Sequence, residues 1–89
     1  MADFRDSAVM EWTLGDRLRK ARRVAGMTTE DMAARVGKSR QAVNGYEQDS
    51  HAPALAVLAA WAEATEVPFD WLCLGQSSTK WYIPPSRAA

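Results

Sequence analysis

The sequence has few of the residues from which catalytic and metal-binding sites are built. It contains a single cysteine, Cys73, and a single histidine, His51. An intramolecular disulfide and a cluster of cysteine or histidine ligands are therefore excluded. A nucleophile with its base, or a glycine-rich phosphate loop, cannot be assembled from these residues and the scattered glycines. We expect no enzymatic activity, no metal and no other cofactor.

Long apolar runs are also lacking. The longest apolar stretch, around residues 52–62, is interrupted by Pro53 and is far shorter than the roughly 20 residues of a membrane span. The first residues include Asp3, Asp6 and Glu11 and do not resemble a secretory signal. We therefore expect a cytoplasmic protein without a membrane partner. With 89 residues, the chain makes one domain with one modest core, and no separate ligand domain is expected to bind a small molecule.

The net charge is zero, but the charges are unevenly distributed. From Leu14 to Glu47 there are eight basic and four acidic residues, whereas the rest of the chain has three basic and seven acidic residues. Proteins that bind nucleic acid often concentrate positive charge in the part that faces the phosphates. The asymmetry favours such a division, although the run from Arg17 to Arg23 is also compatible with an ordinary solvated helix face.

Apolar residues recur at helical spacing in five segments, which predicts an all-α, compact five-helix bundle. The segments are joined by very short connections, and the sequence contains no internal repeat. Three helix starts carry side chains that cap a helix: Thr13 with Asp16, Thr28 with Asp31, and Ser39. The expected helices cover residues 14–25, a short stretch after Thr28 that stops at Gly37, about 39–47, a helix that starts at Pro53, and 69–74.

The helix that starts at Pro53 is expected to contribute most to the core, because it carries the densest apolar pattern. That pattern consists of Leu55, Leu58, Trp61, Ala62 and Thr65. By contrast, the helix at 39–47 has only one narrow apolar edge, made by Val43 and Tyr46, so much of its surface should be exposed.

The two ends of the chain stand apart from this bundle. We divide the chain into an N-terminal extension (1–12), a domain (13–75) and an aromatic C-terminal tail (76–89), in which residues 80–83 could form one short strand. Exposed aromatic side chains are unfavourable in water, so the tail is expected to pack on the domain or on a second subunit. The residues predicted for a dimer interface are Trp71, Leu72, Leu74, Trp81, Tyr82 and Ile83. The same residues could instead fold back as an intramolecular cap.

The segment from Thr28 to Glu47 contains two short helices joined by a tight turn. Its second helix should expose Arg40, Gln41 and Asn44. An exposed helix fits the major groove of B-DNA, where arginine pairs with guanine, and glutamine or asparagine pairs with adenine. These three residues are therefore the candidates for reading bases, although any one of them could simply solvate a surface helix.

The same segment resembles the Cro/repressor-type, or lambda-repressor-like, helix-turn-helix family. The resemblance covers roughly residues 13–75 and implies a five-helix fold that binds operator DNA, usually as a dimer, and controls transcription. It rests on Leu14 to Leu18, Arg22, Gly26 to Thr28, Met32, Ala33, Gly37 to Ser39, Val43, Glu47, Pro53 and Asp70 to Leu72.

Carried over position by position, the resemblance implies base reading by Arg40, Gln41 and Asn44. It implies DNA backbone contacts for Thr29, Lys38 and Ser39. The chain departs from the family at Thr29, where a glutamine is usual, and at Gly45, where a larger side chain often extends the base contacts. We therefore expect a narrower reading surface.

The resemblance bears on two further features, an ion pair and the loop after the reading helix. Arg22 and Glu47 match a pair that forms an internal salt bridge in the family, so we predict a structural role for them. In the loop after the reading helix, Asp49 replaces a typical glycine and would oppose an approach to phosphates. His51 in the same loop is predicted to be a weak contact to the DNA backbone.

The sequence thus favours a sequence-specific regulator that binds double-stranded DNA, with a stand-alone repressor of the Cro or phage immunity type as the specific form. The alternative is a protein-interaction module on the same fold, for example an antitoxin or an adaptor. Such a module would bind a protein through the aromatic tail together with Phe69 and Trp71. Neutral net charge and Thr29 favour this alternative, whereas the three polar residues on one face of the reading helix oppose it.

Overall fold

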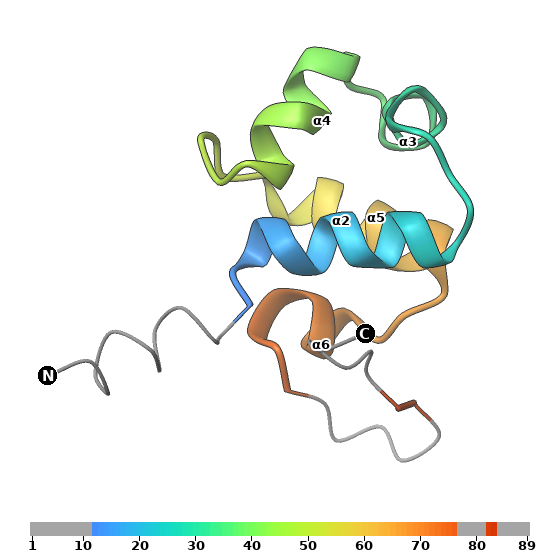
Figure 1. Cartoon of the computed structure of the whole chain (residues 1–89), viewed down its shortest axis with the longest axis vertical. Coiled ribbons are helices and arrows are strands. Elements are labelled where there is room, and N and C mark those ends of the chain that lie inside the picture. Colours follow the sequence, from blue (N-terminus) through green and yellow to red (C-terminus); the bar gives the residue numbers. More distant parts are fainter. Residues whose placement is uncertain (1–11, 77–81, 84–89) are drawn as a thin grey trace, which may run out of the picture.

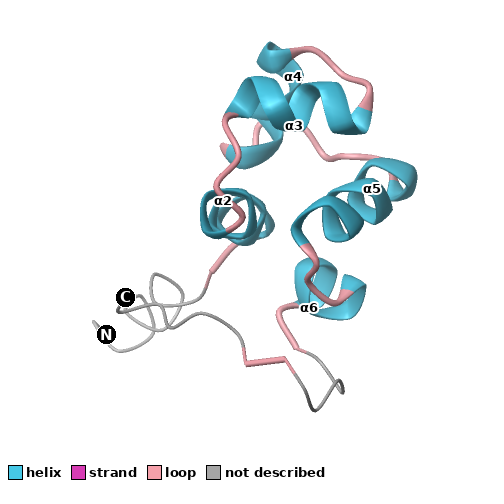
Figure 2. Ribbon diagram, turned by 90° about the vertical axis from the view of Figure 1, so that its right-hand side faces the viewer, coloured by secondary structure: helices cyan, strands magenta, loops and turns pink. Residues whose placement is uncertain are grey.

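The computed structural model describes residues 12–76 and 82–83. Within these ranges the chain forms five helices and no strand: α2 (Leu14–Val24), α3 (Thr29–Val36), α4 (Arg40–Glu47), α5 (Leu55–Thr65) and α6 (Phe69–Leu74). Helices α3 and α4 lie at one end of the molecule and α6 at the other, with α2 and α5 between them (Figure 1). A view turned by 90° gives the same order (Figure 2). The predicted all-α, five-helix architecture is confirmed.

The strand predicted for residues 80–83 is not formed by Tyr82 and Ile83, and its other residues lie outside the described ranges. Among the helices that are described, none combines the length and the apolar character of a membrane span.

Short-range hydrogen bonds explain where three of the helices begin. The Thr13 hydroxyl accepts a hydrogen bond from the Asp16 amide at 3.1 Å, and the Asp16 carboxylate accepts one from the Thr13 amide at 3.0 Å. Thr28 and Asp31 repeat this reciprocal pair at the start of α3, and the Ser39 hydroxyl caps α4. These side chains satisfy amides that have no partner inside the helix. All three predicted caps are confirmed.

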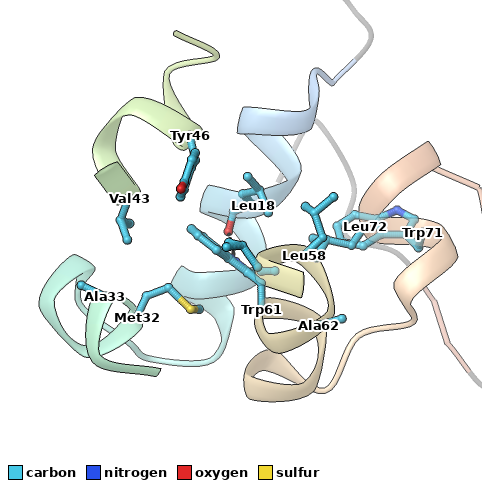
Figure 3. Close-up of a cluster of buried hydrophobic side chains, with 12 residues drawn as sticks. Leu18, Met32, Ala33, Val43, Tyr46, Leu58, Trp61, Ala62, Trp71 and Leu72 are labelled. Atoms are coloured by element: carbon cyan, nitrogen blue, oxygen red, sulfur yellow. Dashed lines mark hydrogen bonds between the residues drawn. The ribbon is translucent and has the colours of Figure 1, made fainter. Parts of the chain in front are cut away.

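The core receives one fully buried side chain from each of the five described helices. These are Leu18, Met32, Val43, Trp61 and Leu72. Trp61 lies among the others (Figure 3), and its indole Nε1 donates a hydrogen bond to the Leu18 carbonyl at 3.1 Å. The buried indole N–H is thus satisfied, which allows the largest core side chain to join α5 to α2 without an unpaired polar group.

Helix α5 begins later than predicted. Pro53 lies before the N-cap residue Ala54, and the helix starts at Leu55, whose side chain is 72% exposed. The prediction that Leu55 belongs to the core is therefore wrong. The rest of the helix does supply much of the core, through Val57, Leu58, Trp61 and Ala62.

Helix α6 corrects the predicted dimer interface. Trp71 is 3% exposed and Leu72 is fully buried within one copy of the chain, so the prediction that these two residues form a dimer interface is wrong. Both side chains pack beside Leu58 of α5 (Figure 3), because six residues of helix suffice to turn them inward. Neither is available to a second subunit.

The Arg17 guanidinium fastens α6 to α2. Its Nε donates to the Leu72 carbonyl and its Nη2 to the Cys73 carbonyl, both at 2.8 Å, while Nη1 donates to the Trp12 carbonyl at 2.9 Å. Partial burial lowers the pKa of Arg17 below its ordinary value, but an arginine remains charged at neutral pH. Arg17 therefore stabilises the packing of α6 on α2, although it belongs to a basic run that was predicted to be able to face phosphates.

Tyr82 of the C-terminal tail packs on the domain. Its ring centroid lies 5.5 Å from that of Trp71, which in turn meets Trp12 edge-on at 6.4 Å. Burial raises the pKa of the Tyr82 phenol. For this residue the structure supports the intramolecular cap. Trp81 lies outside the described residues, whereas Leu74 and Ile83 are 73% and 87% exposed.

Candidate nucleic-acid interface

The turn between α3 and α4 sets the angle at which α4 leaves the bundle. Gly37 ends α3 in the left-handed conformation, with φ at 72°, which glycine adopts without a steric penalty. The next amide, that of Lys38, donates to the Ala33 carbonyl at 3.0 Å, and Ser39 then caps the following helix. Only three residues separate the two helices, so α4 is held against α3 at the end of the molecule.

Helix α4 has one buried and one exposed side. Val43, Tyr46 and Glu47 are buried against the bundle. Arg40, Gln41 and Asn44 are exposed. Asn44 neighbours both of the others on the helix surface, because residues three and four apart in a helix share a face. The arrangement presents one cation and two side-chain amides, all of which can form paired hydrogen bonds with the edges of bases.

The side chains predicted to touch the DNA backbone surround the start of this helix. Lys38 and Ser39 are exposed, and Thr29 is a half-buried residue at the first position of α3. The Ser39 hydroxyl already accepts a hydrogen bond from the Ala42 amide at 3.0 Å, although its own proton can still be donated. His51 is exposed in the loop that follows α4.

A buried ion pair joins the end of α4 to α2. Arg22 Nε lies 2.6 Å from Glu47 Oε2, and Arg22 Nη2 lies 2.9 Å from Glu47 Oε1. The remaining guanidinium nitrogen, Nη1, donates to the Met27 carbonyl at 2.9 Å. The hydrogen bonds to Glu47 raise the pKa of Arg22 above its ordinary value. Since Arg22 is 8% and Glu47 5% exposed, both residues belong to the interior and not to the surface that could meet DNA.

Comparison with known proteins agrees with this geometry. A family model described as helix-turn-helix matches residues 18–72, which is more than half of the chain. The chain belongs to the helix-turn-helix family. No curated protein and no solved structure matches the chain significantly. Members of this family are DNA-binding domains and not enzymes, so the chain is a helix-turn-helix regulator whose partner is double-stranded DNA.

Asp49 has a structural role in this helix-turn-helix domain that the sequence analysis missed. Its carboxylate accepts hydrogen bonds from the Gly15 amide at 2.9 Å and from the Thr13 hydroxyl at 2.6 Å. A negative charge at the N-terminus of α2 also interacts favourably with the helix dipole. Asp49 takes a left-handed conformation, with φ at 61°, which aspartate tolerates better than most residues. The carboxylate therefore points at α2 and has its own partners.

Gly15 makes that contact possible. A Cβ atom there would collide with the backbone carbonyl of Glu47 and would lie 2.7 Å from the Asp49 carboxylate. Glycine at this position thus lets the end of α4 and the following loop lie directly on α2. A substitution would displace backbone, which cannot move aside as a side chain can.

Gly45 of the helix-turn-helix faces the loop and not the predicted reading surface. It is buried, and a Cβ built there would collide with the ring of His51. The Ser50 hydroxyl donates to the Gly45 carbonyl at 3.2 Å and holds the loop in place. His51 therefore covers position 45 of α4. The narrower base-reading surface stays a prediction.

Part of the positive charge in the first half of the chain is used inside the domain. Arg17 and Arg22 bind carbonyl and carboxylate oxygens, and Arg19 Nη2 donates to the Glu47 carbonyl at 3.3 Å. Arg35 of α3, Lys38 of the turn and Arg40 of α4 are exposed cations in the helix-turn-helix segment. A separate cleft of about 330 Å³ is lined by Trp12, Asp16, Arg19, Lys20 and Arg23. Over the described ranges, no group of three or more acidic, histidine or cysteine side chains could hold a metal ion.

Proposed function

We propose that this chain is a transcriptional repressor that reads an operator sequence by placing α4 in the major groove. Arg40, Gln41 and Asn44 contact base edges in this proposal. The observation that carries it is the two-sided character of α4, with three polar side chains exposed and the opposite side buried, in a chain of the helix-turn-helix family. Arginine with guanine, and glutamine or asparagine with adenine, are the pairings that the geometry of the groove favours.

The DNA backbone is bound by the residues that flank the reading helix: Thr29, Lys38, Ser39 and His51. Lys38 and Ser39 stand at the N-terminus of α4, whose unpaired amides attract a phosphate. Such contacts fix the orientation of the helix but carry no sequence information. They should make the affinity fall with salt, and removal of Lys38 should reduce the salt slope by about one.

The repressor acts as a homodimer in this proposal. Operators of two-fold symmetry place two half-sites one helical turn apart, roughly 34–36 Å, which one copy of α4 cannot span. Leu74 belongs to α6, which lies at the end of the molecule opposite α4 (Figure 1). Of the predicted interface residues that the structure describes, Leu74 and Ile83 are exposed and remain for a subunit contact. Domain boundaries at residues 13 and 75 remain part of the proposal.

The operator sequence need not be known for the test, because the protein itself can select its binding site. The full chain selects binding sites from a randomised duplex library, and its affinity for the selected site is compared with that for a mixed-sequence duplex at several salt concentrations. The double variant Arg40→Ala, Gln41→Ala is measured beside it. The matched control is Arg23→Ala, Gln76→Ala, which removes the same residue types from exposed positions elsewhere.

We expect the reading-helix variant to lose roughly 5- to 150-fold in discrimination for each base contact removed. Circular dichroism should show both variants folded, and the control should bind like the parent chain. Weak binding that is equal on both duplexes and unchanged in the variant Arg40→Ala, Gln41→Ala would overturn the proposal that the chain is a repressor. The alternative, a protein-interaction module, would then be the function to pursue. A selected site without two-fold symmetry, together with a monomeric mass in sedimentation, would overturn the proposal of a homodimer.

A further inference from the structure

The base-reading arginine has a partner on the preceding helix. Arg40 Nη1 lies 3.2 Å from Glu30 Oε2, and the two side chains are 62% and 73% exposed. Glu30 belongs to the first turn of α3, so the contact spans the turn between the two helices of the helix-turn-helix. An acidic residue interacts favourably with the N-terminal end of a helix. Here it also places a negative charge on the side of the domain that carries the reading helix.

The contribution of this carboxylate to folding stability is small. An ion pair between two exposed side chains adds little to folding, and α3 already has its cap in Thr28 and Asp31. Toward DNA, the charge of Glu30 is unfavourable, since it repels phosphates whatever the base sequence. The contact with Arg40 is the interaction through which Glu30 can act on DNA recognition in a favourable way.

We infer that Glu30 is a positioning residue that sets the sequence preference of Arg40. The inference rests on the proposed function. Arginine has a long side chain with many rotamers, and a nearby charged phosphate competes with guanine for the guanidinium. The contact with Glu30 uses Nη1 and leaves Nε–H and Nη2–H on the adjacent edge, which is the edge suited to a side-by-side pair with O6 and N7 of guanine. The same carboxylate keeps phosphates away from the guanidinium.

This role predicts opposite changes in two quantities: the affinity for DNA of any sequence and the preference for guanine at one base pair. Neutralising Glu30 removes a repulsion, so binding to DNA of any sequence should tighten. It also releases Arg40 to pair with phosphate, so the preference for guanine at the position that Arg40 reads should weaken. A residue with only a structural role would weaken both the affinity for DNA of any sequence and the preference for guanine.

The experiment uses the full chain with Glu30→Gln and Glu30→Ala. The control is Glu63→Gln, which removes the same charge from an exposed position on α5. The probes are a mixed-sequence duplex and the site selected by the unsubstituted chain, with each base pair replaced in turn. We expect about threefold tighter binding of the mixed-sequence duplex by Glu30→Gln. The preference at one base pair should fall by about fivefold, the lower end of what a base contact contributes. Glu63→Gln should change neither quantity by more than about twofold.

Glu30→Asp and the double variant Glu30→Gln, Arg40→Ala complete the design. Aspartate keeps the charge on a shorter side chain and should restore part of the preference. In the Arg40→Ala background, Glu30→Gln should leave the preference unchanged. The inference is overturned if Arg40→Ala abolishes the preference while Glu30→Gln preserves it, or if Glu63→Gln has the same effect as Glu30→Gln. If the unsubstituted chain shows no preference, or Arg40→Ala does not alter it, the proposed function fails and the inference fails with it.

Discussion

Replacing Glu47 with alanine removes one half of the buried pair that joins α4 to α2. Arg22 would keep its charge at 8% exposure, with the Met27 carbonyl as its remaining hydrogen-bond acceptor. Breaking a buried pair in this way costs about 3–5 kcal/mol, because the second charge stays in the interior without compensation. A domain the size of residues 12–76 has a total unfolding free energy of roughly 3–10 kcal/mol. The variant should therefore be marginal or unfolded.

The assay is urea and thermal unfolding, followed by tryptophan fluorescence, to which the buried Trp61 contributes, and by circular dichroism. At roughly 4–8 °C for each kcal/mol, the midpoint should fall by about 12–40 °C. The exposed Glu63→Ala is the control and should change the unfolding free energy by less than about 0.5 kcal/mol. The double variant Arg22→Met, Glu47→Leu should recover most of the loss, since it leaves no buried charge. If Glu47→Ala kept the unfolding free energy of the parent chain and lost DNA binding, Glu47 would act at the interface and the structural assignment would be refuted.

Three further predictions concern single side chains. Asp49→Ala should lower the unfolding free energy by about 1–2 kcal/mol, because it removes the carboxylate that accepts hydrogen bonds at the start of α2. Asp49→Asn should lower the unfolding free energy less, because asparagine tolerates the left-handed conformation. Equal urea midpoints for the two variants would contradict this. Hydrogen bonds from the backbone and side chain of Thr28 lower the pKa of Asp31, so its contribution to stability is present above about pH 4 and is lost as pH falls through the lower folded-state pKa. The difference between the parent chain and Asp31→Asn in urea unfolding should thus be largest near neutral pH and vanish in acid, and a constant difference would refute the cap. Burial raises the pKa of the Cys73 thiol. Alkylation by iodoacetamide should therefore reach its half-maximal rate at a higher pH in the folded chain than in urea. A half-maximal rate at a lower pH in the folded chain would show that the thiol is activated.

Local features of the sequence predicted the helices well. The pairs Thr13 with Asp16 and Thr28 with Asp31 are three residues apart, so the hydrogen bonds that cap α2 and α3 follow from the sequence alone. The exposed side of α4 follows in the same way from its narrow apolar edge. Such features depend on neighbours along the chain, and the rest of the fold has little influence on them.

Contacts between distant residues could not be predicted in this way. Arg17 binds carbonyls of α6 more than 50 residues away, and its position in a basic run suggested a phosphate contact instead. Asp49 looked unfavourable for DNA because nothing in the sequence showed its position beside the start of α2. The burial of Trp71 was underestimated since the packing of a six-residue helix depends on the surface that receives it. The pairing of Glu30 with Arg40 likewise spans a turn that links two helices.

The contact between Gly45 and His51 limits how this protein could acquire a new target sequence. A larger residue at position 45 would push against the imidazole ring, so the loop would have to be redesigned together with the helix. Positions 40, 41 and 44 are exposed and carry no such restriction. Under the proposed function, retargeting by mutation is therefore easiest in the first turn and a half of α4. An operator that requires a base contact from position 45 would need a second change at His51.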